Sequence, residues 1–97
     1  MNDAREPALV PARPVRGRHG AVASPHHLAS EAGLATLRAG GSAVDAAIAA
    51  NAALAVVSGH SCGLGGDAFW LIWDAERSAA VTLNGSGRAG RGATIEA

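Results

Sequence analysis

Residues 43–57 are the part of the sequence that most restricts how the chain can fold. Every position in this stretch is apolar except Asp45 and Asn51. A helix that is apolar on nearly every face must be covered on most sides. The stretch is also too short for a bilayer, which needs about 20 apolar residues. We therefore predict a helix that begins at Ser42, ends near Val57 and is buried in protein, and we expect no membrane partner.

The side chains available to line such a core are small. Alanine supplies 24 of the 97 residues, the aromatic share is 3%, and tyrosine is absent. Burying a methyl group stabilises a fold much less than burying a leucine or phenylalanine side chain. Small chains also bury a smaller share of their surface. The predicted core is therefore thin, and we expect the chain to need a partner or a continuation of the polypeptide.

Charge and cysteine content exclude several classes of protein. Eight arginines and no lysine balance eight acidic residues, so the net charge is zero. Without a basic field, we expect no nucleic-acid partner. The single Cys62 cannot form an internal disulfide, and no metal-ligand spacing occurs, so we expect no metal. Residues 1–20 contain no apolar signal-peptide core, which favours a cytoplasmic location.

The chain divides into a tail and one folded segment. Residues 1–18 are rich in proline and arginine and follow no helical or strand period, so we predict a flexible tail. The folded segment covers residues 19–97 and begins with a short strand at 19–24. Ser24 and Pro25 are typical of an N-cap and a first helical position. They predict a helix over 26–39, which Gly40 and Gly41 end.

The second half predicts one more helix and a hairpin. Asp45 lies three residues after Ser42, the spacing of a capping box. The almost continuous apolar run at 68–73 predicts a strand buried on both faces. A turn at 74–78 and a returning strand at 79–83 complete an antiparallel hairpin. The order strand-helix-helix-strand-strand is typical of an α/β (α+β) layered fold, and its sheet is incomplete.

Three short motifs have the form of catalytic or cofactor-binding sites. His60 and Cys62 form a possible base and nucleophile, but residues two apart in a loop seldom have the required geometry, and Cys62 also suits a small buried position. The sequence Gly85-Ser-Gly-Arg-Ala-Gly90 matches G-x-G-x-x-G but lacks the helix and acidic residue of a dinucleotide site. The loop at 63–66 lacks a phosphate-binding lysine. Neither glycine-rich run therefore predicts a dinucleotide-binding or phosphate-binding site.

Two polar residues allow both a structural and a ligand-binding interpretation. Asn51 is either a hydrogen-bonded structural amide or a substrate contact. Arg88 is either a solvated side chain or a fork donor suited to a carboxylate. It belongs to the second of two glycine-rich loops, at 58–67 and 84–92, which flank the predicted hairpin. Glycines let backbone N–H groups approach a ligand closely.

Four segments resemble the N-terminal region of the γ-glutamyltransferase (γ-glutamyltranspeptidase) family. They are His19-Gly-Ala-Val-Ala-Ser24, Leu28-Ala-Ser-Glu-Ala-Gly33, Leu37-Arg-Ala-Gly-Gly-Ser-Ala-Val-Asp-Ala-Ala47 and His60-Ser-Cys-Gly-Leu-Gly-Gly-Asp-Ala-Phe69. The resemblance implies part of the N-terminal-nucleophile hydrolase fold, an αββα sandwich of two sheets between helices.

The resemblance also implies a mechanism. Members of the family are precursors that cleave themselves into a large and a small subunit. The new N-terminal threonine of the small subunit attacks a γ-glutamyl amide such as glutathione, without a metal or cofactor. Thr36, Thr82 and Thr94 are not in that nucleophile motif. We therefore expect no catalytic residue in this chain, which alone would be inactive. Its partners would be a C-terminal remainder or small subunit and a small γ-glutamyl or acyl-amide substrate.

The segment after the hairpin departs from the family pattern. The family holds the substrate carboxylate with an arginine in a pattern like asp-x-arg-glu-x-ala-pro. Here Ser86 occupies the arginine position, Arg88 follows two residues later, and Gly90 replaces the proline. The stretch resembles the divergent branch that includes acylase-like and amidohydrolase-like members. Ser86 and Arg88 are the substrate-binding candidates.

A non-catalytic role is the alternative hypothesis. The chain would then be a remnant that binds a small carboxylate or associates with a related subunit. A folded, monodisperse 97-residue protein would favour this module, whereas aggregation or disorder would favour a fragment of an enzyme.

Overall fold

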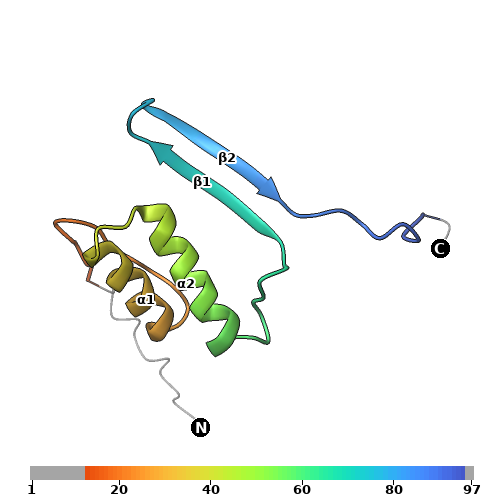
Figure 1. Cartoon of the computed structure of the whole chain (residues 1–97), viewed down its shortest axis with the longest axis horizontal. Helices are drawn as coiled ribbons and strands as arrows, with labels where there is room; N and C mark the ends of the chain where they lie inside the picture. Colours follow the sequence, from red (N-terminus) through yellow and green to blue (C-terminus); the bar gives the residue numbers. More distant parts are fainter. Residues whose placement is uncertain (1–12, 96–97) are drawn as a thin grey trace, which may run out of the picture.

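The computed structural model describes residues 13–95, which form two helices followed by two strands (Figure 1). The helices are α1 (His27–Arg38) and α2 (Ala43–Val57), and the strands are β1 (Ala68–Asp74) and β2 (Ala79–Gly85). The α+β class and the helix-helix-strand-strand order are confirmed. Most of the predicted tail at 1–18 lies outside the described residues, and residues 13–18 are exposed.

The predicted strand at residues 19–24 is wrong. In the described part of the chain β1 and β2 pair only with each other, and no third strand joins them. Residues 19–24 instead pack on the helices, where Val22 lies against Gly33. A Cβ atom on Gly33 would come within 2.9 Å of Val22 Cγ1. The missing side chain of Gly33 thus makes room for this segment on α1.

The start of α1 also differs from the prediction. Its N-cap is His26, whose Nδ1 accepts a hydrogen bond from the backbone N–H of Leu28 at 3.2 Å. Ser24, the predicted cap, donates to the backbone oxygen of His26 at 2.8 Å. It therefore stabilises the turn before the helix. The predicted glycine end is confirmed, because Gly40 has a φ of +91°, which glycine adopts without strain.

The predicted capping box of α2 is present. Ser42 Oγ accepts from the N–H of Asp45 at 3.2 Å, and Asp45 Oδ2 accepts from the N–H of Ser42 at 2.8 Å. The backbone N–H of Ser42 and, second, the Ser42 hydroxyl, which also donates to Asp45 Oδ2 at 2.8 Å, hold the pKa of Asp45 below its ordinary value. They favour the charged carboxylate at the positive end of the helix dipole.

The prediction that α2 is buried on most sides is wrong for this chain. Within the described residues only Ala46 and Ala50 of α2 are buried. The reason is that α1 covers one face of α2, while Ile48 and Val56 lie exposed on others. The core of the helix pair consists of these two alanines, Ala29 and Gly33, and no large side chain is fully buried. The predicted thin core is confirmed.

The strands form the predicted antiparallel hairpin, extended to Asp74 and Gly85. Ala68 pairs with Gly85, and Asp74 pairs with Ala79. Burial of β1 on both faces is not observed, because its side chains alternate between two faces. Trp70 and Ile72 are half-buried, as the burial pattern of β1 shows.

The other face of β1 is open. Phe69, Leu71 and Trp73 are 71%, 78% and 66% exposed. We call these three side chains the apolar face of the hairpin. Every residue of β2 is exposed as well. Nothing in the described residues covers this face. The predicted burial of both faces of residues 68–73 would require a further layer of protein on this side.

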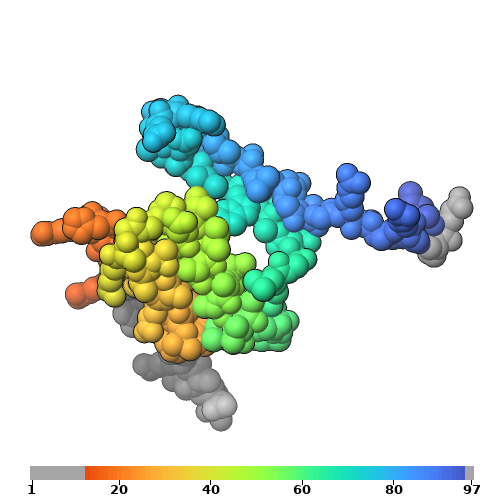
Figure 2. All heavy atoms as spheres, viewed as in Figure 1, coloured from red at the N-terminus to blue at the C-terminus, as the bar shows by residue number. Residues whose placement is uncertain are grey.

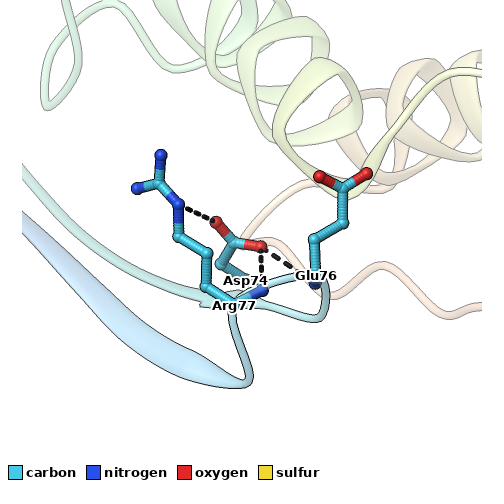
Figure 3. Close-up of polar contacts among 3 residues, drawn as sticks. All are labelled: Asp74, Glu76 and Arg77. Atoms are coloured by element: carbon cyan, nitrogen blue, oxygen red, sulfur yellow. Dashed lines mark hydrogen bonds and ion pairs between the residues drawn. The ribbon is translucent and has the colours of Figure 1, made fainter.

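Asp74 organises the turn of the hairpin (Figure 3). Its Oδ1 accepts from the backbone N–H groups of Glu76 and Arg77 at 3.0 and 3.2 Å. Its Oδ2 lies 3.5 Å from Arg77 Nε. Ser78 closes the turn with a φ of +48°, a conformation that costs a non-glycine residue about 1–2 kcal/mol.

The molecule as a whole is open. The hairpin projects beside the helix pair, and the segment after β2 runs away from both (Figures 1 and 2). The radius of gyration is 18.8 Å, compared with about 13 Å for a compact domain of 100 residues. The accessible surface is 8826 Å², whereas a folded protein of this mass exposes about 5,100 Å². No helix in the described part of the chain is long and apolar enough to cross a membrane.

Candidate functional site

The two glycine-rich segments meet at one end of the hairpin. Ala68 pairs with Gly85, so the end of the segment before β1 lies beside the start of the segment after β2 (Figure 1). Residues separated by more than 15 positions in sequence are thereby brought to the same place. This end of the hairpin carries most of the candidate residues.

The segment before β1 is folded back on the end of α2. The backbone N–H groups of Ser61 and Cys62 donate to the carbonyl of Ser58 at 3.0 and 3.1 Å. Ser61 Oγ lies 3.0 Å from Ser58 Oγ and 3.7 Å from Cys62 Sγ. His60 is exposed and has no hydrogen bond among the described residues. The hydroxyl next to the Cys62 thiol thus belongs to Ser61, and no imidazole is positioned as its base.

A groove of about 560 Å³ separates α2 from the start of β1. Asn51 lines it from the helix, Cys62 and Asp67 from the loop, and Trp70 from the strand. Asn51 is exposed, and its side chain has no hydrogen-bond partner in residues 13–95. Of the two interpretations of Asn51, the internally satisfied amide is not observed.

Ser86 and Arg88 lie just beyond β2. The backbone N–H of Ser86 donates to Asn84 Oδ1 at 3.0 Å, and Gly87 has a φ of +75°. Both side chains are exposed, and neither has a hydrogen-bond or ion-pair partner in the part of the chain that the structure describes. The five nitrogen-bound hydrogens of the Arg88 guanidinium can therefore bind an external carboxylate.

The structure shows what the other motifs lead into. The glycine-rich run at 85–90 is followed by a turn, with no helix up to residue 95. The run at 63–66 leads into β1, not into a helix. In residues 13–95 no three His, Cys, Asp or Glu side chains gather as a metal site would require.

Sequence reasoning missed the role of His26. Histidine is not among the favoured N-cap residues, so the Ser24-Pro25 pair dominated the prediction. In the structure the His26 and His27 rings are stacked with centroids 4.7 Å apart. The sequence feature that could have indicated this cap is the His26-His27 pair directly after Pro25. The helix that follows has no acidic residue in its first turn.

Comparison with known proteins places the whole of this arrangement in one family. The family model described as gamma-glutamyltranspeptidase matches residues 29–97. An oxamate amidohydrolase proenzyme of Klebsiella pneumoniae is 54% identical over 81% of the chain. A glutathione hydrolase-like proenzyme of Bacillus subtilis, YwrD, is 52% identical over 82% of the chain. In both cases the chain spans 15% of the relative's length.

Solved structures agree with the sequence relatives. The γ-glutamyltranspeptidase of Helicobacter pylori superposes with a TM-score of 0.76 at 39% identity, over 84% of this chain and 23% of that one. The enzyme of Pseudomonas nitroreducens, complexed with L-DON, gives a TM-score of 0.74 at 30% identity, over 82% and 23%. The helices and hairpin described above therefore have the arrangement found in these N-terminal-nucleophile hydrolases.

Proposed function

The chain belongs to the γ-glutamyltranspeptidase family, and from this we propose that it forms the first part of an amide hydrolase or acyltransferase. The family consists of enzymes, and its relatives are proenzymes. The observation that carries the proposal is the match itself, which extends over 81% of the chain at 54% identity. The reacting threonine belongs to polypeptide outside these 97 residues, so the chain alone is inactive.

The reaction we propose proceeds through a covalent acyl-enzyme. The threonine hydroxyl attacks the amide carbonyl, its own α-amino group accepts the hydroxyl proton and passes it to the amide nitrogen, and the C–N bond breaks to release the amine. Water or an acceptor amine then attacks the ester and releases the acyl group. The 97 residues contribute by holding the substrate, not by forming or breaking bonds.

Two substrates of different size follow from the relatives' names. One relative is named for oxamate and another for glutathione. Oxamate and the γ-glutamyl group of glutathione each carry a carboxylate. We propose that Arg88 binds this carboxylate as a fork donor, with Ser86 beside it. The proposal rests on the exposed Arg88 guanidinium at the end of the hairpin, which has no partner within residues 13–95.

A large polypeptide partner accounts for the open shape. The chain exposes about 3,700 Å² more than a folded protein of its mass. A second copy stacked on the apolar face would hide only the exposed parts of Phe69, Leu71 and Trp73, roughly 500 Å² per copy. The remainder of the enzyme, whether a continuation or a separate subunit, supplies a surface of the required size.

Co-expression tests this function. The chain is produced together with a polypeptide that carries the remainder of the family fold, including the nucleophile. We expect a complex that releases p-nitroaniline from a γ-glutamyl anilide or ammonia from oxamate. A folded, processed complex that hydrolyses neither substrate would contradict the enzymatic proposal. A chain that is folded and monodisperse alone, and binds no such polypeptide, would favour a separate binding module.

A further inference from the structure

The first turn of α1 is held by an uncharged histidine. His26 Nδ1 accepts the hydrogen bond from the N–H of Leu28 at 3.2 Å. An imidazole nitrogen can accept only when it carries no proton, because both nitrogens of the imidazolium are donors. The cap observed in the structure therefore requires His26 to be neutral, with its proton on Nε2.

Several features of the surroundings oppose a positive charge at this point. The His27 ring is stacked on His26 with centroids 4.7 Å apart, so two protonated rings would repel each other. The N-terminus of a helix is the positive end of its dipole. The first turn contains no acidic residue that would offset this charge.

The remaining ionisable groups near the cap are few. On α1 itself, Glu31 lies four residues after His27 and is the first carboxylate along the helix. In the segment before the helix, Ser24 and Pro25 do not ionise, and the nearest ionisable residue in sequence, His19, lies near the other end of α1. Along α2, which packs against α1, no ionisable residue follows Asp45, and the next one along the chain is His60.

The cap also holds the segment that precedes it. Ser24 Oγ donates to the carbonyl of His26 at 2.8 Å and lies 2.7 Å from Ser30 Oγ. Through this turn the cap fixes where residues 19–24 return over the helix pair and place Val22 against Gly33. Loss of the His26 cap would therefore affect the preceding segment as well as the hydrogen bond to Leu28.

We propose that the His26 cap is an acid-sensitive device that releases the first turn of α1 and the preceding segment when His26 is protonated. At neutral pH the imidazole closes the helix. In acid, the protonated Nδ1 is a donor that faces the N–H of Leu28, and the charged His26 and His27 rings repel each other.

Amide hydrogen exchange on the chain in its complex with the remainder of the enzyme tests the proposal. The readout is the protection of the Leu28 to Ala32 amides relative to those of α2, whose Ser42–Asp45 cap keeps its charge in this range. We expect this ratio to fall roughly fivefold, the effect of losing an N-cap, from pH 7.5 to 5. The His26→Asn variant retains a cap that does not titrate, so its ratio should stay constant.

The His19→Gln variant is the matched control, because it removes a histidine that lies near the opposite end of α1. It should behave like the wild type. A constant ratio in the wild type, an equal fall in His26→Asn, or the absence of α1 protection at pH 7.5 would each overturn the proposal. Nitrogen-15 shifts of the ring give a second test. They should show His26 as the Nε2-protonated tautomer at pH 7.5, and a proton on Nδ1 would contradict the cap.

Discussion

At Gly33 the two helices and residues 19–24 lie so close together that an added methyl group would not fit. A Cβ atom there would lie 2.9 Å from Val22 Cγ1 and 3.2 Å from the Ala46 carbonyl. Ala46 belongs to the small-residue core, and its backbone oxygen cannot move away alone. This one position therefore decides how closely α1, α2 and residues 19–24 can pack.

Gly33→Val should disrupt this packing. We expect it to lower the free energy of unfolding by about 2 kcal/mol, because overpacking a tight contact costs about 1–3 kcal/mol. Amide hydrogen exchange of α1 and α2, with the chain in its complex, measures the effect. Ala35→Val is the matched control on the exposed side of α1, and it should cost no more than its helix propensity, less than about 0.7 kcal/mol. Equal effects of the two substitutions would show that Gly33 is not a contact point.

Arg88 gives a prediction at the same scale for function. In the active complex, Arg88→Lys keeps the charge but removes the fork, so we expect KM for a carboxylate-bearing amide to rise by roughly tenfold or more. The kcat should change less, because the residue does not touch the reacting bond. Arg91→Ala, three residues later in the same exposed segment, is the control. If Arg88→Lys leaves KM unchanged, the carboxylate is bound elsewhere.

Among the elements, α2 owes its start to the Ser42–Asp45 pair. The folded-state pKa of Asp45 lies below the ordinary value of 3.8, mainly because its carboxylate accepts the backbone hydrogen bond of Ser42. A lowered pKa means that the charged form adds stability above pH 3.8. That stability is lost as the pH falls through the lower, folded-state value.

The expected result is an acid-induced loss of α2 stability that begins near pH 4. Thermal unfolding between pH 7 and 2.5 measures it. Asp45→Asn should remove this part of the pH dependence, whereas Asp67→Asn, whose carboxylate accepts no hydrogen bond in the described residues, should leave it. Ser42→Ala should cost about 1 kcal/mol at pH 7. A pH profile of Asp45→Asn identical to the wild type would contradict the assignment.

The hairpin turn contains a strained residue that glycine would relieve. Ser78 has a φ of +48°, so Ser78→Gly should stabilise the hairpin by about 1 kcal/mol. Ala75→Gly, in the same turn but without a positive φ, should be neutral or destabilising, because it only adds chain entropy. Amide exchange within β1 and β2 distinguishes the two. A loss of protection in Ser78→Gly would contradict the strain.

The elements that local sequence signals specify were predictable. The Ser42–Asp45 spacing, the glycines after α1 and the two apolar runs around a polar turn each predict their structure from neighbouring residues alone. The errors occur where the answer depends on distant residues. Residues 19–24 pair with no strand within residues 13–95, and Val22 packs on Gly33 instead. The cap of α1 is His26, because its ring reaches the Leu28 N–H.

The candidate site was only partly accessible to sequence reasoning. Glycine-rich loops on either side of a hairpin are visible in the sequence, and antiparallel pairing then brings them together. The groove between α2 and β1, with Asn51 facing it unpaired, is a product of tertiary packing that no local pattern reveals. The roles of Ser86 and Arg88 stay predictions, because both side chains are exposed and no contact within residues 13–95 assigns them a ligand.

For the whole molecule, surface area is the dominant feature. The core consists of three buried alanines and a glycine. The accessible surface of the chain exceeds that of a folded protein of the same mass by about 3,700 Å². The apolar face of the hairpin is part of this exposed surface, although its hydrophobic sequence predicted burial. The remainder of the proposed enzyme would cover this surface, whereas a separate binding module would leave it exposed.

The measurement that tests this account most directly is the intact mass of the native polypeptide that contains these residues, taken from the source cell. We predict a species much larger than 9.6 kDa, or a pair of subunits of which the second begins with threonine. A native species of 9.6 kDa, with no associated polypeptide, would contradict the account and leave a binding module in place of an enzyme.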